Sequence, residues 1–292
     1  MIQAAPVSGF AAAGLPDFFA PGVATAFVLT ALRIGGLMLV APAWSAKTVQ
    51  MRLRTAIIVV FTVMIAPSAN ATADLATLQI TPATFLAETA VGFVIGLAAA
   101  VVIAGAEFAG ELITISIGLS GAAIFDPVRN TQGMILGQFM QLLSLVVLLI
   151  GGGHILMLQA LAASFQAMPL GAPIDLGAGF AAFVPMASSI FSTGLQFSAP
   201  VIAAVLVTNI ALAVLGRAAP QLQIMSLAFP IQIGVGMLTF AGSIALVVHS
   251  MSDWTPTYTR SLDAFARAAT APAATSTVRG SATAPATPVV RP

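Results

Sequence analysis

The sequence "ELITISIGLSGAAIFDPVRNTQG", residues 111–133, interrupts a chain that is apolar along most of its length. It begins with residues typical of a helix, continues with small residues and a Phe-Asp-Pro step, and ends with an arginine and polar side chains. Pro127 prevents a helix from continuing, because proline lacks the backbone N–H and its ring clashes with the preceding turn. The stretch therefore predicts an irregular connection between two apolar helices.

Composition decides what kind of protein surrounds this connection. Of 292 residues, 59% are hydrophobic and only 7% are charged, whereas a soluble domain carries about 25% charged residues. So few charges cannot cover a soluble surface, which predicts an integral membrane protein. The net charge of +1 argues against a nucleic-acid partner. The absence of cysteine excludes disulfides, thiolate metal sites and a cysteine nucleophile.

Hydropathy divides the chain into apolar segments separated by short connections. The segments cover roughly residues 22–43, 55–67, 83–117, 134–165, 180–215 and 224–249. A membrane-spanning helix needs about 20 apolar residues, and most of these segments are long enough, although 55–67 is short. The predicted fold class is all-α: a polytopic membrane protein of about six hydrophobic helices packed as a helical-hairpin bundle.

The two ends of the chain differ from this apolar domain. We expect residues 1–21 to form an N-terminal segment and residues 22–250 to form the hydrophobic domain. Residues 251–292 end in "ATAPAATSTVRGSATAPATPVVRP", which repeats Ala, Thr and Pro without apolar periodicity. That composition predicts a disordered tail.

Basic residues are concentrated in alternate connections. The first, third and fifth connections carry Lys or Arg, whereas the second and fourth carry only Asp74 and Asp175. Short connections rich in Lys and Arg remain in the cytoplasm. The pattern predicts that the odd-numbered connections are cytoplasmic and that both termini lie on the other side of the membrane.

Several ionisable residues lie at membrane depth: Arg33, Glu88, Glu107, Glu111 and His154. Charges inside a membrane face the bundle interior or water. Glu107 and Glu111 occupy one helix face. Two interpretations of the pair are open: the carboxylates relay protons or bind a cation, or they are hydrated or paired with an arginine. His154 follows "GGG" and is expected to hydrogen-bond a backbone carbonyl at a helix start, so no metal or cofactor is predicted.

Glycine spacing predicts close helix packing. Gly92 and Gly96, and again Gly133 and Gly137, form G-x-x-x-G pairs, which let transmembrane helices approach each other within this chain or between subunits. The sequence has no P-loop, nucleophile elbow, HExxH or dinucleotide fingerprint. These observations favour a protein that packs tightly with others and not an enzyme.

Four motifs, in order, resemble the flagellar biosynthetic protein FliR family. They are "LRIGGLMLVAPAW" (32–44) with "RLRTAIIVVFTVMIAP" (52–67), "AGELITISIGLSGAAIFDP" (109–127), "GGGHILMLQALAASFQAMPLG" (151–171) and "NIALAVLGRAAPQLQIMSLAFPIQIGVG" (209–236). The resemblance covers most of residues 27–248 and does not include the C-terminal tail.

This resemblance implies a subunit of the flagellar type III protein export gate in the bacterial inner membrane, within the flagellar basal body. FliR-like proteins assemble with FliP-like and FliQ-like subunits beside an FlhB-like protein. Together they form the channel that exports unfolded flagellar proteins. The family bundle is shifted along the membrane normal, so six regular spans overstate the expected topology.

The resemblance also assigns roles to particular residues. The loop after the third segment is expected to plug the pore, with glycines giving backbone freedom and Ile124 and Phe125 forming an apolar constriction. The plug residues are Gly118, Leu119, Ser120, Gly121, Ile124, Phe125, Asp126 and Pro127. At the tip of the last hairpin, Arg217, Pro220 and Gln221 are expected to contact the FlhB-like partner, or Arg217 caps its own helix and faces lipid phosphates.

Two other functions stay open from the sequence. A virulence-type (injectisome) export-gate subunit differs little in its motifs from a flagellar one. An ion-coupled secondary transporter would use Arg33, Glu107, Glu111 and His154 as one ion site. Transporters of that class show inverted repeats and interrupted helices in matching halves, and no such repeat is visible in this sequence.

Overall fold

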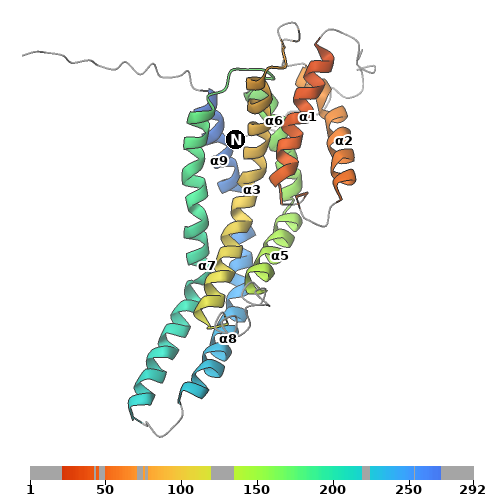
Figure 1. Cartoon of the computed structure of the whole chain (residues 1–292). Coiled ribbons are helices and arrows are strands. Elements are labelled where there is room, and N and C mark those ends of the chain that lie inside the picture. The colour runs from red at the N-terminus through yellow and green to blue at the C-terminus, as the bar shows by residue number, and fades with distance from the viewer. Residues whose placement is uncertain are drawn as a thin grey trace, which may run out of the picture.

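The computed structural model describes residues 22–42, 44–45, 50–70, 75, 78–119, 135–218, 224–252 and 254–270. The regular structure in these ranges is α-helical, which confirms the predicted fold class. The helices are α1 Val23–Val40, α2 Met51–Asn70, α3 Pro82–Ser116, α5 Ile135–Ile150, α6 Gly153–Ala167, α7 Leu176–Ala218, α8 Ile224–Ser252 and α9 Thr255–Thr270. They run back and forth along one long axis, with α5–α6 and α8–α9 each continuing in one direction (Figure 1).

Five of the described helices are long and apolar enough to cross a membrane: α1, α2, α3, α7 and α8. The α5–α6 pair makes a sixth span only as a broken helix, because it bends by 66°. The prediction of one apolar helix over 134–165 is therefore wrong at its centre. The helix ends at Ile150 and restarts at Gly153, and Gly152 has a φ of +73°, which favours glycine. The short second segment extends past Pro67 to Asn70.

Buried apolar side chains form two cores stacked along α3. The first core joins α1, α6 and α9 to residues 91–103 of α3. The second core joins α5, α7 and α8 to residues 106–113 of α3 and to Ile117, which follows the end of α3. Trp254, from the α8–α9 junction, packs at the α5–α6 bend, where a Cβ on Gly153 would lie 2.7 Å from the Trp254 ring. The two helix breaks therefore meet at one level of the molecule.

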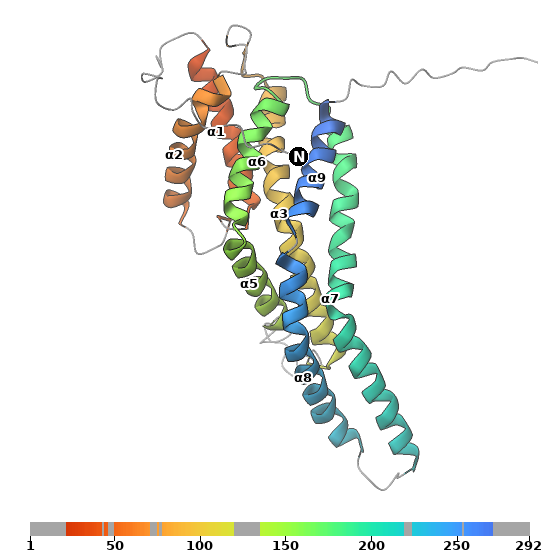
Figure 2. The same ribbon diagram turned by 180° about the vertical axis from the view of Figure 1, so that it is seen from behind.

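Helix α9 corrects the prediction that residues 251–292 form a disordered tail. Helix α8 extends to Ser252, and α9 packs against α7 and α3, as the views in Figures 1 and 2 show. Tyr258 and Phe265 are buried, and the Tyr258 hydroxyl donates to the Ile95 carbonyl at 3.3 Å. Burial raises the pKa of Tyr258, so this donor stays protonated. Residues 271–292 lie outside the described part of the chain.

Glycines bring α1 and α3 into backbone contact. A Cβ added to Gly36 would collide with the Thr89 carbonyl, and one added to Gly92 would collide with the Arg33 carbonyl. A Cβ on Gly96 would lie 2.8 Å from the Leu37 carbonyl oxygen. The predicted G-x-x-x-G packing of Gly92 and Gly96 thus occurs within this chain, whereas Gly133 lies outside the described residues.

Adjacent glycines on α1 provide a matched test of this packing. Gly36→Ala should destabilise the chain by roughly 1–3 kcal/mol, because the added methyl forces two backbones apart. Gly35→Ala should be neutral or slightly stabilising, since nothing lies within 4 Å of its Cβ position and alanine favours helices. The measurement is the fraction of protease-resistant chain in isolated membranes after heating. Equal losses for the two variants would contradict the close approach of α1 and α3.

Candidate functional site

Arg33 and Glu88 form a buried ion pair between α1 and α3. The Arg33 Nε donates to Glu88 Oε2 at 2.7 Å, and the side chains are 0% and 1% exposed. Arg33 also donates to the Ser164 hydroxyl at 3.1 Å and to the Met168 carbonyl at 3.0 Å. Its guanidinium carbon lies 4.4 Å from the centre of the Phe165 ring, a cation–π geometry.

The ion pair connects three parts of the chain. The other Glu88 oxygen accepts a hydrogen bond from the Gly171 N–H at 3.0 Å, so the pair holds the turn after α6 against α1 and α3. Both side chains are fully used within the chain and present no charge to another subunit. Arg33 and Glu88 therefore face the interior of the helical bundle, one of the two environments expected for charges at membrane depth.

Glu107 and Glu111 lie on the face of α3 that meets α5. Glu107 accepts a hydrogen bond from Gln141 Nε2 at 3.0 Å. A Cβ on Gly137 would lie 3.2 Å from the Glu111 side chain, so this glycine makes room for the acidic pair. Both carboxylates are partly exposed.

His154 lies in the first turn of α6. Its Nδ1 is buried without a hydrogen-bond partner, so this atom does not make the predicted bond to a backbone carbonyl. Among the described residues, no group of three or more His, Cys, Asp or Glu side chains could hold a metal ion. Arg33 pairs with Glu88, and Glu107 pairs with Gln141. Arg33 and Glu107 therefore do not meet in the single ion site that the transporter alternative requires.

The root of the predicted plug loop is the C-terminus of α3. The Gly118 N–H donates to the Ile115 carbonyl at 3.1 Å, and the Leu119 N–H donates to the Thr114 carbonyl at 3.2 Å. With Gly118 at φ +82°, this is a Schellman motif. Gly118 was expected to give the loop backbone freedom, but it acts as a helix stop. Ser120, Gly121, Ile124, Phe125, Asp126 and Pro127 lie outside the described residues.

Gln232 of α8 is a residue that the sequence analysis did not select. Its Nε2 donates to the Ser116 carbonyl at 2.6 Å, and Phe229, one turn earlier on α8, lies 3.6 Å from the Cβ position of Gly118. Helix α8 therefore contacts the loop root directly. An available signal was that Gln232 carries the one amide side chain in the predominantly apolar α8 sequence.

The C-terminal end of α7 and the start of α8 lie at the end of the molecule farthest from α9 (Figure 2). Arg217 is in the last turn of α7 and is exposed, a position that favours a cation beside the helix C-terminus. Pro220 and Gln221 lie outside the described residues.

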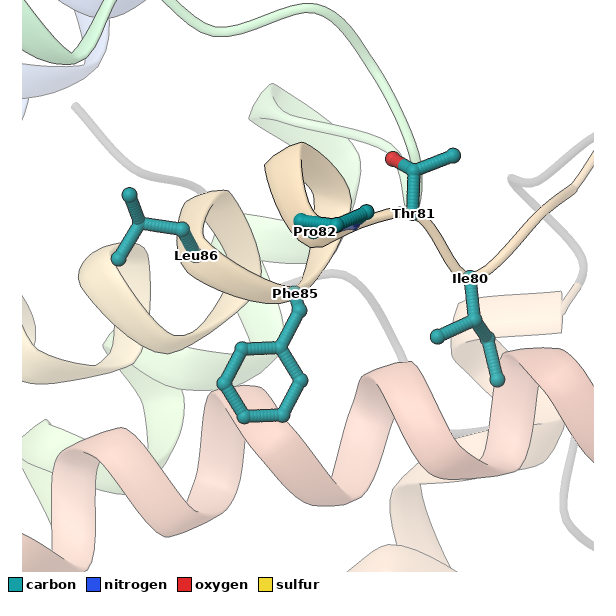
Figure 3. Close-up of a pocket in the computed structure, with 5 residues that line it drawn as sticks. All are labelled: Ile80, Thr81, Pro82, Phe85 and Leu86. Atoms are coloured by element: carbon teal, nitrogen blue, oxygen red, sulfur yellow. The ribbon is translucent and has the colours of Figure 1, made fainter.

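A shallow hollow at the start of α3 offers no additional ligand-binding site. It is lined by Ile80, Thr81, Pro82, Phe85 and Leu86 (Figure 3). Its polar member, Thr81, caps α3: its hydroxyl accepts from the Thr84 N–H at 3.1 Å, and Thr84 Oγ1 accepts from the Thr81 N–H at 2.9 Å. With this hydroxyl engaged in a capping box, the hollow is an apolar surface feature.

Comparison with known proteins matches the helical body to one family. The model of the bacterial export proteins, family 1, matches residues 24–256. The flagellar biosynthetic protein FliR of Pectobacterium carotovorum is 30% identical over 223 residues, which cover 74% of this chain and 83% of the relative. FliR of Escherichia coli K12 is 32% identical with the same coverages. FliR of Caulobacter vibrioides is 26% identical over 249 residues, 98% of its length.

The match includes each element described above except most of α9, which begins at Thr255 and continues beyond the matched range. The buried ion pair, the acidic pair, the loop root and the hairpin all lie within it. This chain belongs to the bacterial export protein family 1, to which its resemblance to FliR pointed.

Proposed function

We propose that this chain is a flagellar export-gate subunit that lines and seals a channel for unfolded flagellar proteins across the bacterial inner membrane. The observation that carries the proposal is the family match over residues 24–256, which includes the apolar helices and the loop root. The chain acts as a structural subunit and not as an enzyme. The flagellar relatives support a flagellar system over a virulence-type one.

The long exposed surface of α7 supports assembly with other subunits. Large apolar side chains are exposed along this helix from Phe180 (51%) to Leu215 (47%). At 1.5 Å per residue this stretch is about 52 Å long, whereas the bilayer hydrocarbon core is about 30 Å thick. Lipid tails cannot cover the whole stretch. FliP-like and FliQ-like subunits would cover the remainder.

Co-purification tests this assembly. We expect the chain to be obtained in a stable form only when it is expressed with its FliP-like and FliQ-like partners, because isolated α7 leaves apolar surface beyond the bilayer in water. The measurement is size-exclusion chromatography followed by limited proteolysis, with the chain expressed alone as the control. A monodisperse, protease-resistant monomer in detergent would contradict the proposal.

The charge pattern supports an orientation with the hairpin tip in the cytoplasm. Arg217 lies in the last turn of α7, next to the α7–α8 connection, and no other charged residue occurs between Asp175 and Asp253. Positive charges in short connections favour the cytoplasmic side. In this orientation Arg217, Pro220 and Gln221 would lie at the channel entrance, where an FlhB-like protein would contact them.

Cysteine crosslinking tests the entrance contact, and the native chain has no cysteine to interfere. We expect Arg217→Cys or Gln221→Cys to crosslink to cysteines in the cytoplasmic loop of the FlhB-like partner. Leu238→Cys, which is 77% exposed on α8, is the matched control and should not crosslink to that loop. If position 217 reacts only with reagents confined to the periplasm, the orientation is inverted.

A further inference from the structure

Among the described residues, one backbone carbonyl at the C-terminus of α3 has no donor from its own helix end. The last four carbonyls of a helix lack intrahelical donors. Here Ile113 accepts from the Ile117 N–H, Thr114 from the Leu119 N–H and Ile115 from the Gly118 N–H. Ser116 is the remaining one, and its carbonyl accepts the Gln232 side chain of α8 at 2.6 Å.

Two apolar contacts accompany this hydrogen bond. Gly236, one turn after Gln232, faces Ile117, and a Cβ added to Gly236 would lie 3.2 Å from the Ile117 Cβ. Phe229 faces Gly118. Ile117 is itself fully buried in the second core. Three successive residues of the loop root, 116–118, therefore each contact α8.

We propose that Gln232 is a positioning residue that fixes the root of the α3–α5 connection to α8. The α7–α8 hairpin then sets where this connection starts, so a movement of the hairpin at the channel entrance is transmitted to the loop root. This inference rests on the proposed function, in which the connection seals the channel. Without the amide donor, a partly buried carbonyl loses its partner and the root is held by apolar contacts alone.

Gln232→Met tests the inference in the fully assembled gate. Methionine keeps the length and flexibility of the side chain but removes the donor. We expect the ion leak of the idle gate to rise roughly tenfold, because the loss of one donor to this partly buried carbonyl raises the population of gates with a displaced loop root by about that factor. Thr239→Val is the matched control on α8. Its hydroxyl donates within the helix, to the Val235 carbonyl at 2.8 Å, so the leak of this variant should stay at the wild-type level.

A reversible disulfide crosslink distinguishes loss of the positioning role of Gln232 from general damage to the assembled gate. Ile117→Cys with Gly236→Cys places two Cβ atoms at 3.2 Å, a few tenths below the usual 3.5–4.5 Å range for disulfides. In the Gln232→Met background, oxidation should reseal the gate and reduction should reopen it. A leak that persists after oxidation, or failure to assemble in both redox states, would overturn the inference.

Deletion of the loop in the same strain distinguishes this inference from the proposed function. If deletion of residues 120–125 leaks and Gln232→Met does not, Gln232 has no positioning role and the sealing function stands. If neither variant leaks, the sealing function itself fails.

Discussion

Glu88→Gln should prevent the chain from accumulating in the membrane. The substitution leaves the Arg33 guanidinium fully buried without its counter-charge. Removing one partner of a buried ion pair costs about 3–5 kcal/mol, which is a large fraction of the roughly 5–15 kcal/mol free energy of unfolding of a typical domain. Arg33→Met should be equally damaging, because it leaves the Glu88 carboxylate buried without a cation.

The double variant Arg33→Met/Glu88→Gln should recover much of the loss. It removes both charges, and the glutamine oxygen still accepts from the Gly171 N–H. Replacing both members of a buried pair is often nearly neutral. Glu111→Gln is the control, since that side chain is partly exposed. The measurement is the amount of full-length chain in isolated membranes; a double variant as depleted as the single ones would contradict a paired role.

The class and the order of the helices were predictable because hydropathy is a property of each segment alone. The bend at Gly151–Gly152 was not predicted, because apolar residues continue on both sides and only the local glycines mark it. Helix α9 was not predicted either, because its composition is polar and hydropathy alone does not indicate its buried face. That face is nevertheless periodic, with Tyr258, Leu262 and Phe265 at helical spacing.

The candidate site was predictable as a set of residues but not as a set of contacts. Arg33 and Glu88 stood out as charges at membrane depth, yet 55 positions separate them and no spacing rule joins them. Gly118 was assigned freedom because glycine permits many conformations, whereas the hydrogen bonds around it select one. Gln232 lies 116 positions from Ser116, so its role depends on tertiary packing.

Removal of the loop after α3 should convert a sealed gate into a leaking one. Deletion of residues 120–125 keeps Gly118 and Leu119, so the Schellman motif that ends α3 is preserved. The deletion removes Ile124 and Phe125, the side chains proposed to exclude water from the channel. A dewetted constriction blocks small ions far more strongly than a water-filled one, so the conductance of the idle gate should rise by at least about tenfold.

Ile124→Gly/Phe125→Gly is a milder form of the same change and should leak less than the deletion. Ile80→Gly/Phe85→Gly, in the apolar hollow at the start of α3, is the matched control for loss of an Ile and a Phe. Its conductance should remain at the wild-type level when the complex assembles.

The most direct test of the sealing role measures ion conductance and secretion of flagellar proteins together. The host is a strain that lacks this chain and is complemented with either the wild-type sequence or the deletion of residues 120–125. We predict that without complementation no flagellar protein is secreted, that the wild type restores secretion with a sealed membrane, and that the deletion assembles but leaks ions. An assembled deletion variant with wild-type conductance, or normal secretion without this chain, would contradict the account.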